Sequence, residues 1–167
     1  MPEEITELTA HLQQQSKKSL PKWEELPDID LYMDQVIALM NRYLDNRTKD
    51  KMITPSMVNN YVKMKVMPAP VKKKYTREHL MYLIVICVLK QVMPLSSVET
   101  VLKDGLEQTE PAVFYGRFRE LYGDAFRTAA EETISLTAAG ASRTDAMLSL
   151  AMKAQAEQNL AEDLLEF

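Results

Sequence analysis

Two adjacent asparagines, Asn59 and Asn60, and a run of three lysines, Lys72 to Lys74, are the residues of this sequence best suited to binding chemistry. An asparagine amide donates and accepts hydrogen bonds at once, which matches the N6 and N7 edge of adenine in the major groove of DNA. Lysines neutralise phosphates, so they supply affinity without sequence information. The same amides would also suit surface caps that touch no base, and the same lysines a solvated face.

Charge is distributed unevenly along the chain. The formal net charge is -4, yet residues 47–92 carry ten Lys or Arg against two Asp or Glu. Residues 1–46 carry four basic against nine acidic side chains, and residues 93–167 carry six against thirteen. Because charges are screened within about 10 Å at ordinary salt, the local balance matters more than the total. A basic middle between acidic ends is typical of one element that faces a polyanion.

The residues used in catalysis and metal binding form no recognisable constellation. His11 and His79 lack Cys, Asp or Glu partners at ligand spacing, and His79 is expected at or near the surface. No glycine-rich phosphate loop or activated nucleophile appears, and Glu131 and Glu132 point in different directions on a helix. Cys87 lies in an apolar run too short to span a membrane and is predicted to be a core residue. We therefore expect no enzyme activity, no cofactor, no metal and no membrane association, and a cytoplasmic location.

The elements that must position the asparagines are helices. Four glycines among many helix-favouring residues predict an all-α protein. Apolar spacing predicts a helix over residues 30–44, capped by Asp30. Thr54 and Pro55 are typical of the start of a second helix, over 54–64. The positions of that helix predicted to face outward are Ser56, Asn59, Asn60 and Lys63.

Prolines end this second helix, and VMPAPVKKKY reads as an extended segment that holds its lysines away from the body. Thr76 is expected to cap a helix running to about residue 92, which is apolar nearly all round and therefore central and buried. Ser96 and Glu99 have the spacing of a capping box that opens a short helix to about residue 103.

The remaining sequence predicts a helical hairpin. A broad apolar stripe follows Glu110, Gly140 is placed to end that helix, and Ser142 with Asp145 forms a capping box for a last helix to about residue 167. The apolar stripe of such a hairpin must pack on the basic region or on a second copy of the chain.

The sequence is expected to divide into three segments. Residues 1–29 are predicted to form a helix and an arm anchored by Trp23. Residues 30–105 form the basic domain, and residues 106–167 form a helical region for dimerisation or regulation.

The order helix, turn, helix, basic loop, two helices is that of a winged helix-turn-helix reader. TPSMVNNYVKMKVMPAPVKKKYTREHLMYLIVICVLKQVMPLSSVETVL, residues 54–102, resembles the DNA-binding half of the MerR family. The features that carry the resemblance are a tyrosine in the recognition helix, a hydrophobic residue followed by Pro68 and Pro70, a wing closed by Tyr75 and Thr76, and a helix that opens with SSVE. The whole chain is more similar still to a bacterial family known as a domain of unknown function that carries this MerR-like segment.

The resemblance implies roles for individual residues. Ser56 and Met57 match the first turn that faces the groove, Tyr61 matches a tyrosine that packs and touches phosphate, and the asparagines replace Arg and Tyr. Lys65 departs from the family, since glycine usually ends the helix there, and the tail lacks the long coiled coil and metal-binding cysteines. The expected DNA-binding residues are Arg47, Thr54, Ser56, Met57, Asn59, Asn60, Tyr61, Lys63, Lys65, Lys72, Lys73, Lys74, Tyr75 and Arg77.

These observations predict a sequence-specific DNA-binding transcriptional regulator. The helix over 54–64 would enter the major groove and the wing over 65–77 would contact phosphates. A short helix reads few base pairs, so a homodimer through the C-terminal helices on a pseudo-palindromic site is expected. The alternative is a non-enzymatic protein-interaction module that uses the winged scaffold and the acidic helical tail. The sequence names no small-molecule effector.

Overall fold

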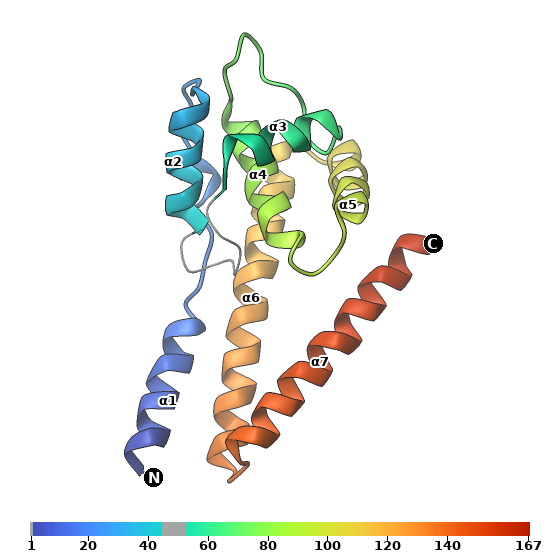
Figure 1. The fold of residues 1–167 in the computed structure, drawn as a ribbon. Helices are drawn as coiled ribbons and strands as arrows, with labels where there is room; N and C mark the ends of the chain where they lie inside the picture. Colours follow the sequence, from blue (N-terminus) through green and yellow to red (C-terminus); the bar gives the residue numbers. More distant parts are fainter. Residues whose placement is uncertain (1, 45–52) are drawn as a thin grey trace. The chain divides into compact units, whose positions relative to one another are not determined.

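The computed structural model of the protein describes residues 2–44 and 53–167. Every regular element in these ranges is a helix, so the all-α prediction is confirmed for the described residues (Figure 1). Two isolated bridges, Leu31 with Tyr75 and Val71 with Lys74, are the strand-like pairings within these ranges. Contacts divide the chain into one unit of Pro21–Phe118 and another of Met1–Leu20 with Arg119–Phe167. The three functional segments expected from the sequence stay a prediction.

The first unit is built around one buried helix. It contains α2 (Met33–Leu44), α3 (Pro55–Lys63), α4 (Arg77–Leu89), α5 (Leu95–Gln108) and the first turns of α6 (Pro111–Ala138). Both α2 and α5 pack against α4, and α2 also contacts α3. The central position predicted for α4 is confirmed, because its side chains from His79 to Cys87 are buried with the exception of half-buried Tyr82.

Two helix starts differ from the sequence prediction. Asp30 does not begin α2, which starts at Met33 after the backbone N–H of Tyr32 donates to Gln35 Oε1 at 2.9 Å. The helix predicted from Ser96 instead begins at Leu95 and continues to Gln108. Pro94 holds the extended backbone of a cap position, φ -67° and ψ 156°, so it places the helix start ahead of the serines.

Within the first unit, the part of the arm that carries Trp23 packs on α6 through an aromatic pair. Trp23 begins a short 3-10 helix, η1 (Trp23–Glu25), and its ring lies 6.2 Å from that of Tyr115. The hydroxyl of fully buried Tyr115 donates to the carbonyl of Pro21 at 2.8 Å. Trp23 therefore anchors the arm, as its size suggested.

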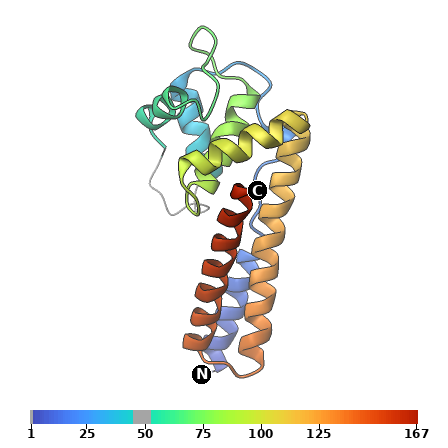
Figure 2. The same cartoon turned by 90° about the vertical axis from the view of Figure 1, so that its right-hand side faces the viewer.

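The second unit consists of α1 (Pro2–Gln15), the remainder of α6, α7 (Arg143–Asp163) and a terminal 3-10 turn, η2 (Leu164–Glu166). Gly140 ends α6 with φ 93°, and its N–H donates to the carbonyl of Thr137. Ser142 and Asp145 then form the capping box of α7. The predicted hairpin and its glycine turn are confirmed, and Figure 2 shows α6 and α7 joined at this turn.

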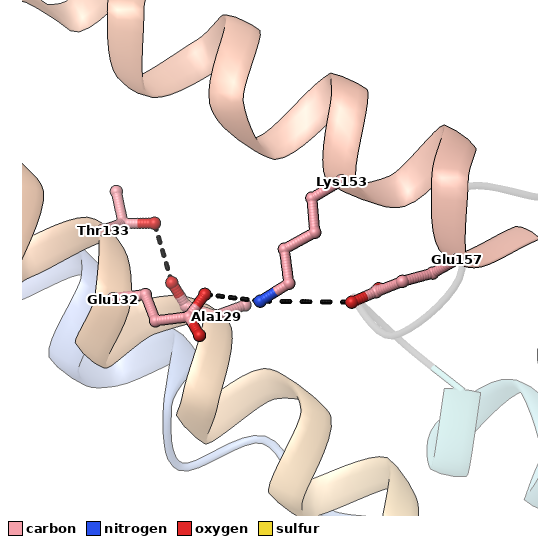
Figure 3. Close-up of polar contacts among 5 residues, drawn as sticks. All are labelled: Ala129, Glu132, Thr133, Lys153 and Glu157. Atoms are coloured by element: carbon pink, nitrogen blue, oxygen red, sulfur yellow. Dashed lines mark hydrogen bonds and ion pairs between the residues drawn. The ribbon is translucent and has the colours of Figure 1, made fainter.

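A polar contact links the two arms of this hairpin. Lys153 Nζ of α7 lies 2.6 Å from Glu132 Oε2 of α6 and 4.0 Å from Glu157 Oε1 (Figure 3). The hydrogen bond to Glu132 raises the pKa of Lys153 above its usual value. Beside it, the buried Thr133 hydroxyl donates to the carbonyl of Ala129.

Most of the apolar surface of α7 remains exposed. Ala146 is the buried residue of this helix, whereas Leu160 and Leu164 beyond it are 63% and 75% exposed. The other exposed large apolar residues from this region are Met147, Leu148, Leu150, Met152 and Phe167. Among the described residues, no helix is both long and apolar enough to cross a bilayer.

Candidate nucleic-acid interface

Helix α3 presents a polar face to solvent and an apolar face to the unit. Val58 and Tyr61 are buried, whereas Ser56, Asn59 and Asn60 are exposed. Lys63 is also exposed, and Met57 and Val62 lie at the margin. The inward and outward positions predicted from the sequence are thus confirmed. At the start of the helix, Thr54 Oγ1 accepts a hydrogen bond from the backbone N–H of Met57 at 3.3 Å.

The entrance to α3 is fixed by an asparagine of α2. The backbone N–H of Ile53 donates to Asn41 Oδ1 at 2.8 Å, and Asn41 Nδ2 donates to the Ile53 carbonyl at 3.5 Å. This paired contact holds the residue that directly precedes the Thr54 cap. Sequence reasoning missed Asn41, because α2 also carries Asp34, Gln35 and Arg42 and nothing in the sequence sets Asn41 apart from them.

The end of α3 is fixed by Lys90, which also escaped the sequence prediction. Lys90 Nζ donates to the hydroxyl of Tyr61 at 3.2 Å and lies 5.9 Å from the centre of its ring. The side chain of Tyr61 is only 4% exposed. The buried Tyr61 therefore ties α3 to Lys90, the residue that follows α4.

Lys65 closes α3 in a left-handed backbone conformation. Its φ is 61°, its N–H donates to the carbonyl of Val62, and the N–H of Val66 donates to the carbonyl of Tyr61. This pair of bonds is a Schellman motif, in which glycine usually occupies the place of Lys65. The backbone geometry expected at that position is present, and the side chain that it carries is an exposed lysine.

The next basic residues form the tip of a tight turn. Lys72 and Lys73 have φ values of 50° and 62°, and the N–H of Lys74 donates to the carbonyl of Val71 at 2.9 Å. Two central residues with positive φ define the hairpin turn that normally favours Asn-Gly. Both lysines are exposed. In both ribbon views, the segment that carries them extends beyond the helices of its own unit (Figures 1 and 2).

The base of this segment is tied down by Tyr75 and His79. Tyr75 exchanges two backbone hydrogen bonds with Leu31, at 2.8 and 2.9 Å, and its side chain is 3% exposed. His79 Nδ1 accepts from the N–H of Thr76 at 3.0 Å, so Nε2 carries the proton and donates to the carbonyl of Ala69 at 3.2 Å. His79 is 6% exposed, and the expectation of a surface or half-buried histidine was wrong. Its two ring nitrogens instead join the segment to the start of α4.

Two of the expected phosphate contacts turn toward residues that precede α2. Arg77 Nε donates to the carbonyl of Leu26 at 3.0 Å, and its guanidinium lies 5.6 Å from the ring of Trp23. Lys74 Nζ lies 5.8 Å from the ring of Tyr32. Arg47 lies outside the described residues. Among the described basic residues from position 53 to 77, those that are exposed are Lys63, Lys65, Lys72 and Lys73.

The exposed amides of α3 can donate and accept hydrogen bonds, and the exposed lysines beside them can neutralise anions. Asn59 and Asn60 supply amides, with Asn60 Nδ2 donating to Met64 Sδ at 3.4 Å, and the exposed lysines supply charge on either side of the prolines. Across the described ranges, no three His, Cys, Asp or Glu side chains gather closely enough to hold a metal ion.

Comparison with known proteins gives a family and no activity. The family model described as Domain of unknown function (DUF1836) matches residues 21–124. Neither the curated proteins nor the solved structures contain a significant match to the chain.

Proposed function

Because the chain belongs to the Domain of unknown function (DUF1836) family, whose description assigns no activity, we propose a function from the arrangement of α3 and its basic turn. The protein is proposed to be a sequence-specific regulator of transcription that binds double-stranded DNA. Helix α3 acts as the recognition helix of a MerR-like winged helix-turn-helix, and residues 65–77 act as its wing.

The observation that carries this proposal is the positive φ of three lysines. In the described residues, the non-glycine positions with positive φ are Lys65, Lys72 and Lys73. A left-handed backbone costs an L-residue about 1 to 2 kcal/mol, which glycine avoids. Strain of this kind is characteristic of functional sites. Lysine occupies all three of these positions, although glycine would be less strained there. This supports a role for the three positive charges in binding an anion.

The exposed amides provide the means to select a sequence. Asn59 and Asn60 lie on the solvent face of a helix whose two ends are fixed by Asn41 and Lys90. A bidentate contact from asparagine to adenine discriminates by about 1 to 3 kcal/mol. Tyr61 and Tyr75, being buried, would contribute by holding this surface in place.

The proposed active form is a homodimer through the C-terminal helices. The exposed Leu160 and Leu164 at the end of the hairpin are an apolar surface that a second copy would cover. An open groove of about 400 Å³ between α6 and α7, lined by Leu121, Ala125 and Leu150, offers a further place for a helix of that copy. Two copies would bring two recognition helices to a pseudo-palindromic site.

Selection of genomic fragments by the purified chain, followed by sequencing, provides the preferred site on which the proposal is tested. Binding to that duplex, followed by fluorescence anisotropy, is expected to weaken with a log–log salt slope of about -4 to -8, because about five to eight phosphates are neutralised at about 0.9 each. Absence of duplex binding at low salt, or binding that does not respond to salt, would overturn the proposal.

Variants separate affinity from specificity in the same assay. Replacement of Lys72, Lys73 and Lys74 by Ala should weaken binding to all sequences alike, whereas Asn59→Ala with Asn60→Ala should weaken the preferred site most. Lys17→Ala, which removes an exposed lysine of the other unit, is the control and should change neither.

The exposed apolar residues of α7 also favour a second candidate, a protein-interaction module that uses the helical tail. This candidate requires a protein partner that binds the chain even when Lys72, Lys73 and Lys74 are replaced by Ala. If cells that carry this triple variant behave like those with the unaltered protein, protein interaction is favoured over DNA binding.

A further inference from the structure

A pocket of about 550 Å³ lies within the first unit, between the end of α3, the segment that follows it, α4 and α5. Its apolar lining includes Val62, Met67 and Leu102. Sites for small molecules typically have volumes of roughly 300 to 1,000 Å³ and mostly apolar walls with a few polar groups. The pocket therefore falls within the size range of a ligand site, and it is open to solvent on one side.

The polar groups of the pocket favour an anion. Lys65 and Lys103 both line it and are exposed, and no ion pair engages either of them within the described residues. Glu99 supplies the single carboxylate, so the charged groups carry an excess of one positive charge. Tyr82 also lines the pocket, and its phenol can donate a hydrogen bond at neutral pH.

We infer that this pocket binds a small organic anion with an apolar body, of the hydrophobic carboxylate class. The apolar part would lie against Met67 and Leu102, and the carboxylate would meet Lys65, Lys103 and the Tyr82 hydroxyl. A cationic ligand would meet two ammonium groups against one carboxylate, which is electrostatically unfavourable.

The position of Lys65 couples this site to DNA, a step that rests on the proposed function. Lys65 lines the pocket and also belongs to the proposed phosphate-binding surface. A ligand anion on Lys65 would neutralise a charge that DNA uses, so the ligand would weaken DNA binding. By linkage, DNA must weaken ligand binding by the same factor.

Titration of the full chain with the fluorescent anion 1-anilinonaphthalene-8-sulfonate, an aromatic sulfonate, tests the pocket. Binding is expected to saturate at one pocket site, to weaken about tenfold in Lys103→Glu, and to weaken similarly in Ala69→Trp, which fills the pocket from its exposed loop. Lys17→Gln, at an exposed lysine of the other unit, should bind the probe as the unaltered protein does. Circular dichroism confirms that each variant is folded.

The exposed apolar side chains of α7 are the competing site for this probe, so Leu160→Ser with Leu164→Ser is the second control. Saturable binding that disappears in that variant, or that is unchanged in both Lys103→Glu and Ala69→Trp, would overturn the inference. Retained binding in the α7 variant supports it.

The coupling between the pocket and DNA is measured as the affinity of the protein for dye-labelled DNA, with and without decanoate, a hydrophobic carboxylate. DNA affinity should fall severalfold in the unaltered protein and change little in Lys103→Glu. Lys103-dependent binding of the sulfonate without any effect of decanoate on DNA affinity would overturn the coupling. Lys103-dependent probe binding in a protein that binds no DNA would overturn the proposed function and leave the pocket inference standing.

Discussion

At the end of α3, Lys65 holds a φ of 61° in a position where glycine would cost less. Lys65→Gly is expected to raise the free energy of unfolding by about 1 kcal/mol, because it relieves the left-handed backbone. The same change should weaken DNA binding and reduce the salt slope by about 0.9, because one phosphate contact is lost. Urea denaturation and fluorescence anisotropy measure the two effects.

Lys63→Gln is the matched control for this substitution. Lys63 is also exposed but lies within the right-handed backbone of α3, so its loss should weaken DNA binding without a gain in stability. A Lys65→Gly protein no more stable than the parent would show that the left-handed conformation at this position stores no strain.

Tyrosines set the response to alkaline pH. Burial is the main cause that raises the pKa values of Tyr43, Tyr75 and Tyr82 above the usual 10.0. The folded state thus retains protons that the unfolded state releases, and stability is full below about pH 10 and falls as pH rises through the folded pKa. Tyr82→Phe should flatten this fall, because phenylalanine cannot ionise. Urea midpoints between pH 9 and pH 11 measure it, and an unchanged pH dependence would contradict the assignment to Tyr82.

At the scale of elements, two asparagines of α2 and α3 should behave in opposite ways. Asn41→Ala removes both hydrogen bonds to Ile53 and should lower the free energy of unfolding by about 1 to 3 kcal/mol. Asn59 is exposed, so Asn59→Ala should change stability by less than about 0.5 kcal/mol while it weakens binding to the preferred DNA site. Denaturation curves and anisotropy of the two variants separate positioning from recognition. Equal losses of stability would refute this division of roles.

Helix α3 is positioned by contacts that converge from separate elements. Asn41 of α2 holds its entrance, Lys90 beyond α4 holds Tyr61, and His79 of α4 fixes the segment that follows at Ala69. A recognition helix needs such support, because small displacements of its amides would break bidentate contacts with a base.

At the scale of the whole molecule, the exposed face of α7 leads to a prediction about assembly. Leu160→Glu with Leu164→Glu should leave circular dichroism unchanged, since both side chains are exposed, and should convert a dimer into a monomer. Sedimentation velocity at several micromolar concentrations measures the state. The monomeric variant should bind a full site with the affinity of a half-site. A parent protein that sediments as a monomer throughout would rule out the proposed assembly.

Much of the local structure could be predicted because it depends on neighbouring residues. Thr54 and Pro55 begin α3, its inward and outward positions follow the helical period, and Gly140 and Ser142 end one helix and begin the next. Family membership agrees with the part of the resemblance that concerned a domain of unknown function. These signals lie within a few residues of the feature that they specify.

The tertiary structure alone decided which side chains support the candidate site. The bonds of His79 to Ala69, Lys90 to Tyr61 and Asn41 to Ile53 join residues separated by 10, 29 and 12 positions. No periodic pattern encodes such pairs, because each depends on how whole helices pack. The left-handed backbone of Lys72 and Lys73 was hidden for the same reason: lysine does not favour positive φ, and the surrounding fold imposes it.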